Sequence, residues 1–121
     1  METNEDRFSI FKHEGERIIN LLGLKDYEIT FKREEKDTAR IAYVNWIPGE
    51  HCFTISFCEN FAGEITTEEI EKAAIEEVLH VLFARFWELA KARTYSEEEV
   101  EYEEHRIIYR LINSGAFSCT I

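Results

Sequence analysis

A chain of 121 residues, 45% hydrophobic and 13% aromatic, is long enough to fold as one domain with a buried core. Its formal net charge of -11 argues against direct nucleic-acid binding and against binding to an anionic membrane surface, because both depend on clustered Lys and Arg. Three cysteines without a Cys-x-x-Cys pair predict neither a disulfide framework nor a zinc knuckle. With no signal peptide and no apolar run of membrane-spanning length, the sequence predicts a single cytoplasmic domain over residues 1–121.

A helix and three strands are predicted first along the chain. Apolar residues recur at helical spacing from Phe8 to Leu22, and Gly23 is placed to end that helix. Residues 27–32 alternate between apolar and polar, which is typical of a half-buried strand. The second strand, Arg40 to Ile47, is apolar on both faces, which predicts a position inside the sheet. A Pro-Gly turn then leads to the third strand, Cys52 to Cys58.

Two helices complete the predicted fold. Thr66 and Glu69 form a capping box that begins a helix reaching to about Arg93. A second capping box, Ser96 with Glu99, begins the last helix. This order predicts an α+β fold with an N-terminal helix, a small three-stranded and mainly antiparallel sheet, and two C-terminal helices.

Candidate chemistry is concentrated in the central helix, at Glu76, Glu77 and His80. At about 100° per residue, Glu76 and His80 lie one above the other beside an apolar stripe, and Glu77 lies just beyond them toward the polar side. A carboxylate and an imidazole at i and i+4 have the spacing of the zinc motif His-Glu-x-x-His, with glutamate in place of the first histidine. The same projection places Glu104 of the last helix in the middle of its apolar stripe, where a carboxylate needs a partner. A divalent ion bound by Glu76, His80 and Glu104 would be that partner, and Glu77 would activate its water.

These residues also have simpler interpretations. Glu76 and Glu77 are also explained as glutamates on a solvated helix face. His80 is also explained as a hydrogen-bonded core residue, and Glu104 as a residue turned toward water or paired with a basic side chain. The aromatic side chains of the central helix are predicted to belong to the core: Phe83, Phe86 and Trp87.

Four segments follow one another in the order and spacing of a known protein family. They are Trp46-Ile47-Pro48 at the end of a strand, the strand Cys52 to Phe57, the helical stretch Ala74 to Leu82, and Glu103 to Ile108. Together they resemble the small zincin-like metallopeptidase domains found in phage and prophage genomes. Those domains are built from a leading helix, a short sheet, a His-Glu-x-x-His helix and a final helix that donates the third metal ligand. The resemblance extends over most of the chain.

The resemblance implies roles for individual residues. Glu77 matches the family's catalytic glutamate, and His80 matches its second histidine ligand. Glu104 is the best match for the third ligand, with Glu103 and His105 as competitors. Glu76 replaces the first histidine, and a carboxylate there shifts the preferred metal from zinc toward manganese, iron or calcium. The resemblance therefore implies a metal-dependent peptidase that hydrolyses peptide or amide bonds of a peptide or protein substrate.

The alternative hypothesis is a non-catalytic relative of the same family. The missing histidine and the net charge of -11 favour an acidic phage-type protein that binds and inhibits a basic, nucleic-acid-binding protein. Such a protein would bind its protein partner and not nucleic acid itself. Metal content distinguishes the two hypotheses, because only the peptidase requires a bound ion.

Overall fold

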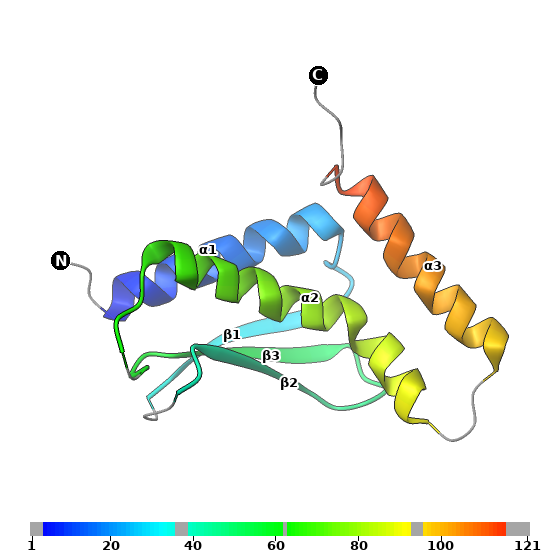
Figure 1. Ribbon diagram of the computed structural model, residues 1–121, viewed down its shortest axis with the longest axis horizontal. Coiled ribbons are helices and arrows are strands. Elements are labelled where there is room, and N and C mark those ends of the chain that lie inside the picture. Colours follow the sequence, from blue (N-terminus) through cyan, green and yellow to red (C-terminus); the bar gives the residue numbers. More distant parts are fainter. Residues whose placement is uncertain (1–3, 36–38, 62, 93–95, 116–121) are drawn as a thin grey trace.

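The computed structural model describes residues 4–35, 39–61, 63–92 and 96–115. Its elements in chain order are α1 (Asn4–Leu22), β1 (Glu28–Glu34), β2 (Ala42–Trp46), β3 (Cys52–Cys58), α2 (Thr67–Lys91) and α3 (Glu97–Asn113) (Figure 1). The predicted α+β fold, with one leading helix, three strands and two C-terminal helices, is confirmed. The predicted helix end at Arg93 and the third cysteine, Cys119, lie outside the described residues. No helix in the described ranges has the length and apolar character needed to cross a bilayer.

The helices begin and end at the predicted local signals. Gly23 has a φ of 68°, a left-handed conformation that glycine adopts without steric cost, and it follows the last residue of α1. The Thr66 Oγ1 accepts a hydrogen bond from the Glu69 N–H at 3.1 Å. Ser96 caps α3 in the same way, by accepting from the Glu99 N–H at 3.1 Å. Both predicted capping boxes therefore mark true helix starts.

The sheet is mixed, and its strand order is β1-β3-β2. β3 is parallel to β1 and antiparallel to β2, so the prediction of a mainly antiparallel sheet with β2 inside it was wrong in these two details. The chain connection explains the order. β1 ends at Glu34, opposite Cys58, and β2 begins at Ala42, opposite Phe57. The end of β1 and the start of β2 thus lie on opposite sides of the same end of β3, with β3 in the centre and β2 at an edge.

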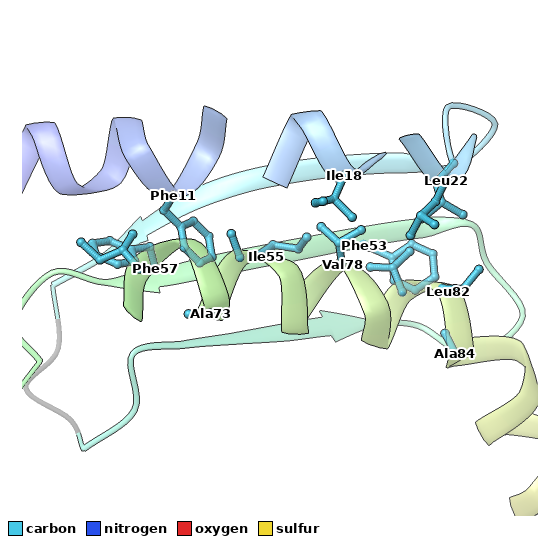
Figure 2. Close-up of a cluster of buried hydrophobic side chains, with 14 of the residues drawn as sticks. Phe11, Ile18, Leu22, Phe53, Ile55, Phe57, Ala73, Val78, Leu82 and Ala84 are labelled. Atoms are coloured by element: carbon cyan, nitrogen blue, oxygen red, sulfur yellow. The ribbon is translucent and has the colours of Figure 1, made fainter. Parts of the chain in front are cut away.

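The core lies between the sheet and the two longer helices. α1 and α2 cover the same face of the sheet (Figure 1). Phe53, Ile55 and Phe57 of β3 point into the layer that α1 and α2 also fill (Figure 2). The Phe11 ring of α1 lies 5.0 Å from the Phe57 ring, measured between centroids. The alternation predicted for the third strand therefore gives the core-facing side correctly.

α3 is attached at one end of this layered structure (Figure 1). Ile107 is its buried apolar anchor. Arg110 donates hydrogen bonds to the carbonyl oxygens of Leu22 and Gly23, at the end of α1, the first of them at 3.3 Å. α3 thus contacts both α2 and the end of α1.

Candidate functional site

A groove of about 570 Å³ lies between β2 and α2. Arg40, just before β2, lies close enough to Glu77 to influence its ionisation. At the other end of β2, the Gly49 N–H donates to Glu88 Oε1 of α2 at 2.8 Å. β2 and α2 therefore run side by side in the same direction (Figure 1). The groove is lined by Arg40, Ala42, Tyr43, Val44 and Trp46 on one side and by Glu77, His80, Phe83, Phe86 and Trp87 on the other.

One wall of the groove ends in a strand edge that pairs with no other strand among the described residues. The Cys58 N–H donates to the Ile41 carbonyl at 2.8 Å, which makes Ile41 and Cys58 a hydrogen-bonded antiparallel pair. In such a ladder alternate residues bond to the partner strand, so the backbone groups of Ala42, Val44 and Trp46 point away from β3. Their side chains lie on the same face as the core residues of β3. This edge can accept another strand whose side chains enter the groove.

The two edges of the sheet differ in charge. β1 carries four charged side chains among its seven residues: Glu28, Lys32, Arg33 and Glu34. β2, with the sequence Ala-Tyr-Val-Asn-Trp, carries none. Charged side chains on edge strands are a common defence against unwanted strand pairing. β2 lacks that defence on the side that faces the groove.

The opposite wall carries exposed aromatic side chains from α2. Phe83 and Trp87 stand one helical turn apart and are 42% and 53% exposed, so their predicted place in the core was wrong. Phe86 is partly buried against the core, as predicted. The prediction placed the buried side of α2 along its large apolar residues. In the structure small residues such as Ala73 and Ala84 are buried as well, so the buried arc of the helix surface lies elsewhere and leaves Phe83 and Trp87 outside it. Large aromatic side chains exposed beside a groove are typical of a binding surface.

Glu77 is buried in the wall of this groove and is only 8% exposed. Its predicted place toward the polar side of the helix was wrong, for the same reason that the aromatic residues were misplaced. Burial raises the pKa of Glu77, and the nearby charge of Glu76 adds to the effect, whereas His80 and Arg40 oppose it. His80 lines the groove one turn away and is exposed. The predicted catalytic glutamate and its histidine neighbour therefore share one cavity.

The structure brings together part of the predicted ligand set: Glu76 and His80 stand one turn apart on α2, whereas Glu104 belongs to α3. Glu76 and His80 are exposed on α2, and Glu104 is exposed on α3, so its predicted position in the middle of the apolar stripe was wrong. Within the described residues, no group of three or more His, Cys, Asp or Glu side chains could hold a metal ion. The donor set required by the metallopeptidase hypothesis is incomplete at this groove.

The competing third ligands have other surroundings. Glu103 is the buried acid of α3, 4% exposed, and its Oε1 accepts a hydrogen bond from Arg106 Nε at 2.6 Å. The carboxylate that needed a partner is thus one residue before the predicted one, and its partner is an arginine. His105 is exposed and stacks on Tyr109, with ring centroids 6.1 Å apart.

Comparison with known proteins finds no match among family models, curated proteins or solved structures. The function is therefore argued from the groove itself. It offers backbone donors and acceptors on the β2 wall, and aromatic surface with a buried carboxyl group on the α2 wall. The sequence signal for its aromatic wall was the i, i+4 spacing of Phe83 and Trp87 outside the buried arc of α2.

Proposed function

We propose that the protein is a non-catalytic binding domain that holds an extended segment of a partner protein in the groove between β2 and α2. The observation that carries this proposal is the free, uncharged edge of β2 beside the exposed aromatic surface of Phe83 and Trp87. When a segment adds as a strand to a sheet edge, its main-chain hydrogen bonds supply the affinity. Pockets that receive every second side chain supply the specificity. The net charge of -11 favours a basic partner, such as a nucleic-acid-binding protein. The free thiols of Cys52 and Cys58 suit a reducing cytoplasm.

Ala42→Pro is expected to weaken binding at the edge without opening the sheet. The Ala42 N–H points away from β3, so proline removes a donor that only an added strand would use. The probe is a random heptapeptide library displayed on yeast. Peptides enriched on the wild-type protein are expected to bind Ala42→Pro about tenfold more weakly, the equivalent of one backbone hydrogen bond.

Ala42→Gly is the matched control, because it changes the same side chain and keeps the backbone donor. It is expected to retain the affinity of the wild type within about threefold. Amide hydrogen exchange supplies an independent readout. On peptide binding, exchange should slow at Ala42, Val44 and Trp46 and stay unchanged at Tyr43 and Asn45, which already bond to β3. Equal binding by Ala42→Pro, or no enriched peptide on the wild type, would contradict strand addition.

A metal-dependent hydrolase of the zincin-like type is the second candidate function. It is favoured by one observation: Glu77 and His80, the predicted catalytic glutamate and motif histidine, line the same groove. Burial also raises the pKa of Glu77, as is common for groups that act as a general acid or base. The described residues do not supply a three-ligand set at this place, so no reaction step is assigned.

Metal content separates the two candidates. After dialysis against zinc, manganese and iron in turn, the binding-domain proposal expects less than one tenth of an equivalent of metal. One equivalent in the wild type, lost in His80→Ala and retained in His13→Ala, would instead establish the hydrolase. His13 is the matched control because it is an exposed histidine on the other long helix, α1.

A further inference from the structure

Two glutamates of the described chain are buried, and they differ in their partners. Glu103 has Arg106. Glu77 is 8% exposed, and among the described residues its side chain makes no hydrogen bond or salt bridge, although it lies within electrostatic reach of His80, Glu76 and Arg40. Burying a carboxyl group without a partner is costly, and it persists where function requires it. The unpaired group faces the groove, where a bound molecule can reach it.

The groove around Glu77 suits a cation. Trp46, Phe83 and Trp87 line it, and aromatic faces attract ammonium and guanidinium groups. The surroundings already use this interaction, because Lys91 Nζ lies 5.1 Å from the centre of the Trp87 ring. The indole N–H of Trp46 is also buried and has no acceptor within the described residues. Glu77 is therefore the acceptor that the groove offers to a cation, whereas the Trp46 indole N–H needs an acceptor, such as a backbone carbonyl of the bound segment.

We propose that the groove selects a lysine or arginine side chain from the partner segment, with its cationic head at the Glu77 carboxylate and its aliphatic stem along the aromatic wall. The proposal rests on the proposed function, because the side chain is delivered by a strand added to β2. On such a strand every second side chain points to the helix-facing side of the sheet. One of these positions therefore has a strong preference for a basic residue.

The charged side chains near Glu77 act in both directions on a bound cation. Glu76 adds negative charge, whereas Arg40 and His80 oppose a bound cation. The Arg40 guanidinium lies over the Tyr43 ring, 5.9 Å from its centre. In this largely desolvated place a charged hydrogen bond to a carboxylate is stronger than the same contact on the surface. The net charge of -11 also favours approach of a basic segment.

The first test is the composition of the peptides that the wild-type protein enriches from the random heptapeptide library. Lysine or arginine at one position, with no preference at its immediate neighbours, is the expected result. Enriched peptides without a basic position would overturn the cation pocket and leave strand addition intact. The absence of any enriched peptide would overturn the proposed function, and the pocket with it.

The second test combines Glu77→Gln with replacement of the selected basic residue of the peptide by glutamine. Glu77→Gln keeps the shape of the side chain and removes its charge, so affinity is expected to fall by about 10- to 100-fold. The two changes together should cost no more than either alone. The matched control, Glu76→Gln, removes an exposed charge on the same helix and should alter affinity by less than about threefold. Additive losses, or equal losses in Glu76→Gln and Glu77→Gln, would overturn the proposal.

Thermal melting shows whether Glu77→Gln remains folded. Because burial raises the pKa of Glu77, its ionisation opposes folding once the pH rises above the carboxyl's ordinary 4.5. Glu77→Gln should therefore melt at a higher temperature than the wild type at pH 7, and this gain should disappear as the pH falls to 4. Weaker peptide binding by a more stable protein would assign Glu77 to binding. A lower melting temperature at pH 7 would show that Glu77 has an internal partner and would overturn the proposal.

Discussion

Arg106→Met is expected to lower the free energy of unfolding by about 3 kcal/mol. Glu103 is 4% exposed, and its carboxylate accepts a hydrogen bond from Arg106 Nε at 2.6 Å. Methionine has a similar length and no charge, so the substitution leaves a buried carboxylate without its counter-ion. Such a loss costs more than the net value of the pair, because the remaining charge is desolvated. Urea denaturation followed by far-ultraviolet circular dichroism measures the change.

The chain contains a matched control for this prediction. Glu14 and Arg17 form the same i, i+3 pair on α1, with Arg17 Nε 2.7 Å from Glu14 Oε1, but the Arg17 side chain is 55% exposed. Arg17→Met should cost less than about 1 kcal/mol, as exposed ion pairs do. Replacing both Glu103 and Arg106 by methionine should recover most of the loss, because no unpaired charge remains. Equal losses in Arg106→Met and Arg17→Met would show that burial does not set the strength of the α3 pair.

Signals carried by a few neighbouring residues were read correctly from the sequence. The capping boxes at Thr66 and Ser96 each depend on one side chain and one backbone N–H three residues away. The end of α1 depends on the positive φ of Gly23. Alternation from Cys52 to Cys58 likewise identified the core-facing side of β3. Each of these features is decided locally, so the sequence alone predicts it.

Strand order was not accessible in the same way. Alternation says which side of a strand faces the core, and it does not say which strand is its neighbour. β2 was assigned to the interior because both of its faces are apolar, yet Tyr43 on its outer face hydrogen-bonds Glu34 at 2.8 Å. The signal for the central strand was in β3, where Ser56 and Cys58 are buried on the face away from the helices. In β3 a face of large apolar side chains is combined with buried small side chains on the opposite face, and this combination marks the central strand.

The candidate site was misjudged by about one residue on each of the two C-terminal helices. On α3 the buried acid is Glu103 and not Glu104, because Ile107 is the buried anchor while Ile108 and Ile112 are exposed. On α2 the small residues of the sheet-facing side move Glu77 into the buried arc. A helical projection that gives most weight to large apolar residues can miss a buried face that packs closely through alanine side chains. One residue is about 100° of rotation, which is enough to separate the predicted metal ligands.

The aromatic wall of the groove is expected to carry most of the binding energy of a partner segment. Phe83 and Trp87 are 42% and 53% exposed, so neither is needed to fill the core. Aromatic residues that become fully covered at the centre of an interface are common hot spots, worth about 2 kcal/mol or more each. Phe83→Ala and Trp87→Ala should therefore each weaken the selected peptides by about 30-fold, the equivalent of 2 kcal/mol. Fluorescence polarisation of labelled peptides measures this loss.

The matched control is Tyr109→Ala, which removes an exposed aromatic side chain from α3, outside the groove. It should leave peptide affinity unchanged. All three variants should unfold within about 1 kcal/mol of the wild type, because surface substitutions rarely cost more. If Tyr109→Ala loses as much peptide affinity as Phe83→Ala and Trp87→Ala, the binding surface extends to α3. Unchanged affinity in Phe83→Ala and Trp87→Ala would show that the aromatic wall does not contact the peptide. The binding proposal would then rest on the β2 edge alone.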